Sequence, residues 1–341
     1  MTVAAKRATA RAPARRTARR IFLTNAKILA GLAILAFFGL LMVAQPLLDA
    51  TLWQTRANVY DPQFGFDSTI AHPSAPSFDH WLGTSSLGRD VFSMLSFATR
   101  PTFVVALTAA AAITVTSLLL GSIAAFRKGW VDGLISHLSD AMVLLPAMLA
   151  VFVLGISRSN AEFGAVHVGL SFGILYGIGP AVATVRAAAM TVVNRPFMDA
   201  ARVAGGRGLW IVSRHVLPHL YAHAAVQAMI GATGAVIADA FLSFRSAVGE
   251  DVGFGMMVYD GIVWSGYLSG IAATPWWIML AGAGGITLLA AAFYLLGVGL
   301  REALDPRAGS EHRVVGDQRW PGPLHSSERA EPGSTEARAA D

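Results

Sequence analysis

The stretch DAARVAG at residues 199–205, followed by RHVLP at 214–218, lies between two long apolar runs, residues 166–185 and 221–244. Each run has the roughly 20 apolar residues that a helix needs to cross the ~30 Å hydrocarbon core of a bilayer. The segment between them is polar and compatible with a helix. We therefore expect two membrane-spanning helices joined by a loop that presents a short polar helix to a soluble partner.

The composition supports a membrane location. Hydrophobic residues make up 54% of the 341-residue chain and charged residues only 14%. Soluble domains contain about 25% charged residues, so much of this chain must lie in lipid, and little of it remains for a soluble enzyme domain. The chain has no cysteine, which excludes disulfides, thiolate metal sites and a cysteine nucleophile.

Apolar runs of spanning length occur at five places, and a sixth run reaches that length when the helix-compatible residues 134–140 are added to it. We therefore predict an all-α fold, a polytopic membrane helix bundle with six transmembrane helices. The predicted spans are residues 28–48, 102–126, 134–156, 166–185, 221–244 and 276–300.

The positions of Lys and Arg predict the orientation. Six crossings put both termini on one side, and that side carries twenty-one of these residues, whereas the loops of the other side carry five. Lys and Arg favour cytoplasmic loops, so both termini and the loop 186–220 are predicted to be cytoplasmic in a multi-pass protein of the cell membrane. The external segment 49–101 is rich in aromatic residues, and we expect it to form a small cap. The positive charge is thus a signal of topology and predicts no nucleic acid partner.

The two ends of the chain differ from the membrane domain, residues 28–304. Residues 1–27 contain eight basic and no acidic residues, which is typical of a segment that contacts anionic membrane lipid. A transit peptide is the alternative interpretation. Residues 305–341 are polar and rich in Pro, Gly and Ser, so we expect a disordered cytoplasmic tail.

Several residues within the spans suggest packing or function. Gly169, Gly173 and Gly177 recur every four residues, so one helix face allows another backbone to approach closely, either within the chain or in a second subunit. A bend is expected at 179–180, which is Gly-Pro. Asp239 near the outer end of its span is a candidate for lining a central pathway or for pairing at that end, and the alternative is that it only reaches the membrane interface.

Two kinds of site are disfavoured. His215, His219 and His223 have the spacing of metal ligands on a continuous helix, but Pro218 argues against such a helix interior, so we expect no metal site. The chain has three lysines, none of them preceded by Gly, so the phosphate-binding P-loop is absent. We therefore expect a non-catalytic chain that hydrolyses no ATP.

Four ordered motifs point to a known family. They are HWLGTSSLGRDV at 80–91, the DAARVAG and RHVLP pair at 199–218, ADAFLSF at 238–244 and GLREALDPR at 299–307. The second resembles the EAA motif of the permease subunits of type I ABC importers, with Asp199 in place of Glu. The set is similar to the MetI-like permeases of the dipeptide and oligopeptide branch.

This resemblance implies a machine of several chains. The permease would pair with a second homologous permease, two ABC ATPase subunits that bind ATP and Mg, and an extracytoplasmic solute-binding protein. The EAA-like region would form a coupling helix seated in a groove of an ATPase. By this analogy Asp199, Ala200, Ala201 and Gly205 carry the contact.

The same resemblance implies roles for the residues on the C-terminal side of Gly205. His215 belongs to the EAA-like region, and Leu217 and Pro218 set the entry into the next span. The chain itself would bind no cofactor.

The cargo and the class of transporter leave alternatives. The same machine serves for nickel chelates, glutathione or another small solute, and residues 245–251 depart from the family pattern with a more charged loop. A proton-coupled secondary transporter is a hypothesis of a different class, with intramembrane Asp residues as the relay. A membrane-embedded hydrolase lacks a clustered nucleophile and base.

Overall fold

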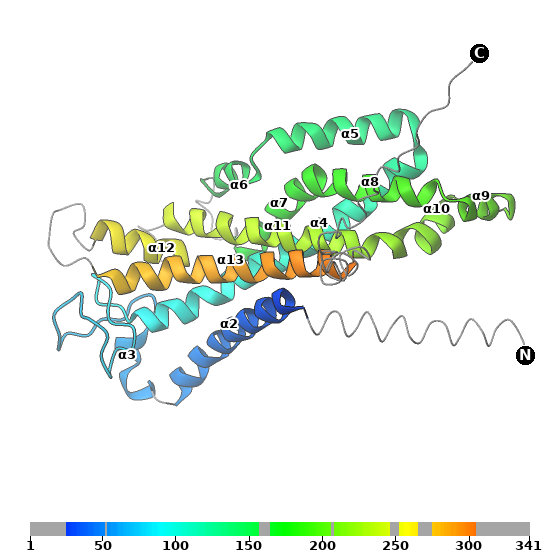
Figure 1. Ribbon diagram of the computed structural model, residues 1–341. Coiled ribbons are helices and arrows are strands. Elements are labelled where there is room, and N and C mark those ends of the chain that lie inside the picture. The colour runs from blue at the N-terminus through cyan, green and yellow to red at the C-terminus, as the bar shows by residue number, and fades with distance from the viewer. Residues whose placement is uncertain are drawn as a thin grey trace, which may run out of the picture. The chain divides into compact units, whose positions relative to one another are not determined.

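The computed structural model describes residues 25–51, 53–156, 164–205, 208–245, 252–264 and 275–304, and these are almost entirely helical (Figure 1). Within these ranges the only contact of β type is an isolated antiparallel bridge between Thr84 and Asp90. The N-terminal residues 1–24, most of the charged loop 245–251 and the tail 305–341 lie outside the described residues, so the expectations for them stay predictions.

The helices follow one another along the chain, and four of them are short 3-10 or π turns. They are α2 (Ala26–Ala50), η1 (Gln54–Arg56), α3 (Ala57–Tyr60), α4 (Val91–Arg127), α5 (Gly129–Leu144), α6 (Ala147–Ile156), α7 (Ala165–Tyr176), η2 (Gly177–Ala181), α8 (Val182–Val193), α9 (Pro196–Val203), α10 (Gly208–Ile211), η3 (Val212–Val216), α11 (Leu217–Arg245), α12 (Phe254–Tyr259), η4 (Asp260–Trp264) and α13 (Trp276–Leu304).

Five helical stretches in the described part of the chain are long and apolar enough to cross a membrane. They are Ala26–Ala50, Val91–Arg127, Ala165–Val193, Val212–Phe244 and Trp276–Leu304. The sixth predicted span, residues 134–156, is divided between α5 and α6, because the helix breaks at Leu145 and Pro146. Proline has no N–H to continue the helical ladder. The predicted count of six is therefore not confirmed.

Two predicted boundaries differ from the structure. The sequence predicts that the second span begins at residue 102, but α4 begins at Val91. There the carboxylate of Asp90 accepts a 2.7 Å hydrogen bond from the N–H of Ser93 and caps the helix. The predicted loop 186–220 is mostly helical. It contains the end of α8, all of α9 and α10, and η3.

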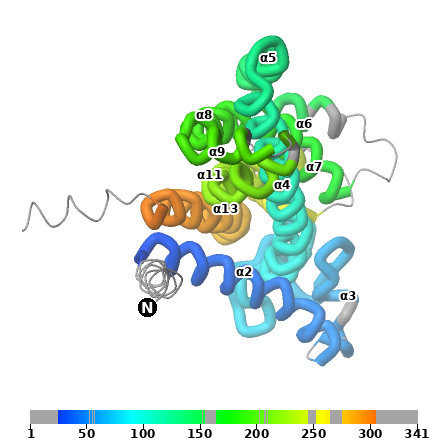
Figure 2. Tube along the Cα trace, turned by 90° about the vertical axis from the view of Figure 1, so that its right-hand side faces the viewer, coloured from blue at the N-terminus to red at the C-terminus, as the bar shows by residue number. Residues whose placement is uncertain are grey.

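Helix α4 is the centre of the packing. It contacts α2, α5, α7, α8, α11, α12 and α13, and Figure 2 shows it among them, with α5 at the edge. The largest buried cluster joins α4 residues such as Met94, Ala106 and Ile113 to α2, α11, α12 and α13. The other helices are therefore positioned mainly through their contacts with α4.

The glycine face of α7 packs against α4 within this chain. A β-carbon at Gly173 would lie 2.6 Å from the carbonyl oxygen of Ala109 and 2.7 Å from the β-carbon of Ala112. Gly169 and Gly177 meet α4 in the same way one turn before and one turn after. The glycine face is expected to pack either within the chain or against a second subunit. The structure shows it packed within the chain, where it brings two backbones close together.

The predicted bend at residues 179–180 is confirmed. Gly179 has non-helical dihedral angles, φ −81° and ψ −108°, inside the π turn η2. Ser139 of α5 donates a 2.8 Å hydrogen bond to the carbonyl oxygen of Gly179. Nearby, Arg186 of α8 binds both carboxylate oxygens of Asp132 at 2.5 and 2.7 Å. These contacts hold α5 against the kinked helix.

The Gly173 contact generates a prediction. Replacing a helical Gly by Ala ordinarily raises helix stability by about 1 kcal/mol, but at Gly173 the added methyl group forces α7 away from α4, and overpacking of this kind costs roughly 1–3 kcal/mol. We expect Gly173→Ala to lower the thermal unfolding temperature of the purified protein. Gly284→Ala is the matched control on α13, where a β-carbon meets nothing within 4 Å; it should leave the temperature unchanged or raise it. Equal shifts in the two variants would contradict the packing.

Candidate functional site

The short helix α9 lies at one end of the bundle, opposite the end that carries α3 (Figure 1). Met198 is fully buried and anchors α9 in a cluster formed by α4, α8, η3 and α11. Asp199, in the first helical turn, and Ala200 are exposed, and Val203 is 90% exposed. The helix is thus held firmly on one side and open on the other.

The remaining residues of the EAA-like region surround this helix. Ala201 packs against the same buried cluster. Gly205 follows α9, is exposed, and has φ +80°, a conformation that favours glycine. Leu217 packs against the cluster at the start of α11. Pro218 follows it inside the continuous helical stretch Val212–Phe244, so the expected break of the helix at this proline is wrong. The carbonyl that loses its helical donor there belongs to Arg214 of the π turn η3.

The histidines of this region make local contacts. His215 lies in η3, with its ring centroid 5.3 Å from that of Trp210. His219 donates a 2.8 Å hydrogen bond from Nδ1 to the carbonyl oxygen of His215 and stacks on Phe197 of α9, with the ring centroids 6.2 Å apart. The ring of Phe197 therefore connects α9 to the beginning of α11.

Asp239 lies near the far end of α11. Its carboxylate accepts a 2.7 Å hydrogen bond from the hydroxyl of Thr102 on α4. It also lines a cavity of about 620 Å³ to which α2, α4, α7 and α11 all contribute. The structure therefore places the acidic residue predicted for a pathway at the wall of a cavity.

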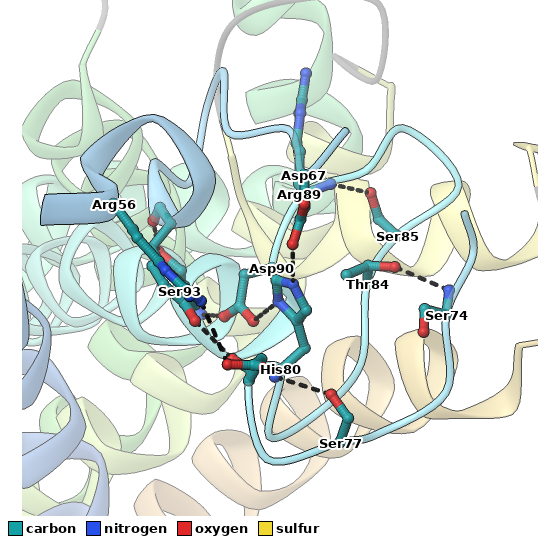
Figure 3. Close-up of polar contacts among 12 residues, drawn as sticks. Arg56, Asp67, Ser74, Ser77, His80, Thr84, Ser85, Arg89, Asp90 and Ser93 are labelled. Atoms are coloured by element: carbon teal, nitrogen blue, oxygen red, sulfur yellow. Dashed lines mark hydrogen bonds and ion pairs between the residues drawn. The ribbon is translucent and has the colours of Figure 1, made fainter. Parts of the chain in front are cut away.

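The loop segment 61–90 is organised by His80 (Figure 3). The ring of this buried histidine contacts Asp90 at 2.8 Å through Nδ1 and Asp67 at 3.3 Å through Nε2. The hydrogen bond with Asp90, opposed by burial and helped by Asp67, raises the pKa of His80. The pKa of Asp67 is lowered to about 2, mainly by hydrogen bonds from Thr69. Because Asp90 also caps α4, His80 links this segment to the central helix.

The model of the family described as "Binding-protein-dependent transport system inner membrane component" matches residues 117–310. This match covers more than half of the chain and includes α9, α11 and α13. The chain belongs to this family.

Curated relatives of this permease cover most of its length. The dipeptide transport system permease protein DppC of Alkalihalophilus pseudofirmus is 29% identical over 293 residues, which are 84% of this chain and 88% of the relative. The protein of the same name from Bacillus subtilis is 28% identical over 287 residues, which are 83% of this chain and 82% of the relative. The chain is thus an integral membrane permease, similar to dipeptide permeases.

Some residues of these sites were not predicted from the sequence. Met198 and Phe197 directly precede the EAA-like motif, and only the packing shows that they anchor α9. The motif at 80–91 contains both His80 and Asp90, but it does not show that their side chains interact. Their spacing of ten residues carries no periodic signal, so only the fold of the loop could reveal the contact.

The pH dependence of this segment follows from His80. Its pKa is raised in the folded protein, so the stabilisation from its charged form is complete below its ordinary value of about 6.5 and is lost as the pH rises through the elevated value. We expect amide hydrogen exchange at residues 80–94 of the permease, corrected for intrinsic rates, to quicken at high pH. His80→Gln, which does not titrate, should remove this dependence. Protection that is independent of pH in the unmodified permease would contradict the role of His80.

Proposed function

We propose that this permease is the transmembrane subunit of an ATP-driven ABC importer for dipeptides or oligopeptides. It forms half of the translocation pathway and is coupled to cytoplasmic ATPases through α9. The exposed but anchored α9 is the observation that carries this proposal. Family membership and the relatives named for dipeptide transport support it.

The exposed surface of α9 suits a protein contact. Ala200 and the nearby Gly205 are small and permit close approach, Val203 supplies exposed apolar area, and Asp199 offers a charge to a cation of the partner. Because Met198 is fixed in the buried cluster, a push on α9 is transmitted to the bundle and is not absorbed by a mobile loop.

Helix α11 offers a path for this motion. It begins next to α9, where Phe197 stacks on His219, and it reaches Asp239 about 33 Å further along at 1.5 Å per residue. A rotation of α9 that tilts α11 would therefore move the wall of the cavity. In the proposed cycle this movement opens the pathway alternately to the two sides of the membrane.

The proposed second permease would cover one stripe of α4. This helix is packed on its other sides, yet Leu107, Val115 and Leu119 are each more than half exposed along one face. The stripe continues from Arg100 and Val104, which line the cavity. A homologous subunit against this face would enclose a pathway between the two chains.

The remaining partners are inferred from the family. An extracytoplasmic solute-binding protein would deliver the cargo to the end that carries α3, and two ABC ATPase subunits would bind ATP and Mg at the end that carries α9. Both termini of the permease would then be cytoplasmic. The permease itself is proposed to be non-catalytic. The family description favours this binding-protein-dependent machine over a self-sufficient secondary transporter.

The coupling role generates a prediction. Ala200 is exposed, so Ala200→Arg should preserve the fold while a bulky charge prevents α9 from seating in the ATPase. We expect loss of at least about nine-tenths of substrate-stimulated ATP hydrolysis by the reconstituted transporter, consistent with an interface energy of roughly 1.4 kcal/mol or more. Gly205→Arg is a weaker test, because the φ of Gly205 adds backbone strain.

The control is Ala75→Arg, the same change at an exposed position in the loop segment at the other end. It should leave copurification of the ATPase unchanged, whereas Ala200→Arg should reduce it. An ATPase that copurifies and responds to substrate with Ala200→Arg would show that α9 does not transmit the signal.

A further inference from the structure

The cavity beside Asp239 is formed by faces of helices that are far apart in sequence. Helix α2 contributes residues 42, 45, 46 and 49, and α4 contributes 97, 100, 101 and 104. These are positions i, i+3, i+4 and i+7, so each set lies on one helix face. The volume of the cavity, about 620 Å³, lies in the roughly 300–1,000 Å³ range of small-molecule sites.

The wall of this cavity combines apolar surface with charges of both signs. Met42, Phe97, Val104, Val168 and Leu242 supply the apolar part. The polar lining residues are Gln45, Asp49, Gln63, Arg100, Asp239 and Ser243. Two carboxylates and one guanidinium give the lining a net negative formal charge, which disfavours a bare anion. A bare cation would leave the guanidinium of Arg100 without a counter-charge. The arrangement suits a ligand that carries both charges.

Arg100 is available to such a ligand. It is exposed at the cavity and forms no hydrogen bond or ion pair within the part of the chain that the structure describes. Asp239, on the facing helix, is oriented by the hydroxyl of Thr102 at 2.7 Å. A charge within a membrane helix is expensive and marks a functional position. A guanidinium fork is well matched to a carboxylate, which it binds through two parallel hydrogen bonds.

Two prolines leave two backbone carbonyls of lining residues without their usual helical donor. Pro46 lies inside α2 and Pro101 inside α4, and both line the cavity. A helical proline has no N–H to donate to the carbonyl four residues earlier. Those carbonyls belong to Met42 and Phe97, which also line the cavity. Carbonyl oxygens without a helical donor are suited to a ligand's ammonium or peptide N–H groups.

We propose that this cavity is a binding site for a short zwitterionic peptide within the permease itself. Arg100 binds the terminal carboxylate, and Asp239 and Asp49 bind the terminal ammonium, while the apolar wall accepts the side chains. The inference rests on the proposed function of peptide import. It adds a selection step for free peptide termini that is separate from the solute-binding protein.

The test compares two probes, dialanine and dialanine amide, which lacks the terminal carboxylate. The assembled transporter is reconstituted in proteoliposomes, and kcat/KM for uptake is measured for both probes. The selectivity is the ratio of kcat/KM for dialanine to kcat/KM for dialanine amide. In the unmodified transporter this ratio includes the preference of the solute-binding protein. With the same binding protein present, we expect Arg100→Ala to reduce this ratio about tenfold, as for a charge-assisted hydrogen bond.

Arg56→Ala is the matched control. Arg56 is an exposed arginine near the same end, paired with Asp79 at 3.3 Å, and it does not line the cavity; its replacement should leave the ratio unchanged. Uptake of dialanine with an unaltered ratio in Arg100→Ala would overturn the cavity assignment and leave peptide import standing. Absence of peptide uptake by the unmodified transporter would overturn both.

Discussion

The close approach of α7 to α4 is the constraint on which the rest of the structure depends. At Gly173 only a hydrogen atom separates the two backbones, since a β-carbon would lie 2.6 Å from a carbonyl oxygen of α4. Helix α4 contacts α7 and α8 on one side and α11, α13 and α2 on others. It is therefore the central helix against which the others pack. One apolar stripe of α4 remains exposed, and the cavity lies at its end. The proposed pathway thus follows the face that the packing leaves open.

The two ends of the bundle differ in their polar contacts, and α11 connects them. At one end α9 is fixed by Met198 and by the stacking of Phe197 on His219. At the other end Asp90 both caps α4 and binds His80, so the loop segment is tied to the start of the central helix. Between them α11 extends from the α9 contact to Asp239. In the proposed cycle, a force applied at α9 would reach the cavity through this one helix.

The sequence predicted most of the fold because apolar runs identify spans directly. The predictions 28–48 and 276–300 are close to α2 and α13. The start of α4 was missed because Ser93, Ser96, Thr99 and Arg100 lower the hydropathy of its first turns, although the Asp90 cap begins the helix there. The sixth span failed to appear as one helix, since Pro146 interrupts it.

The sites could be predicted only where a local motif marks them. The EAA-like spacing indicates the region of α9 as a candidate site, and a charge within an apolar run indicates Asp239 as another. Arg100, Pro46 and Pro101 gave no such signal, because their meaning depends on helices that converge only in three dimensions.

Labelling of two cysteine variants in intact cells tests most directly the claim that α9 and the loop segment 61–90 lie on opposite sides of the membrane. Ser68 and Ser213 are both exposed, and the chain has no other cysteine to interfere. The account predicts that Ser68→Cys reacts with a membrane-impermeant maleimide, whereas Ser213→Cys reacts only after the cells are permeabilised. Equal labelling of both variants in intact cells would contradict it.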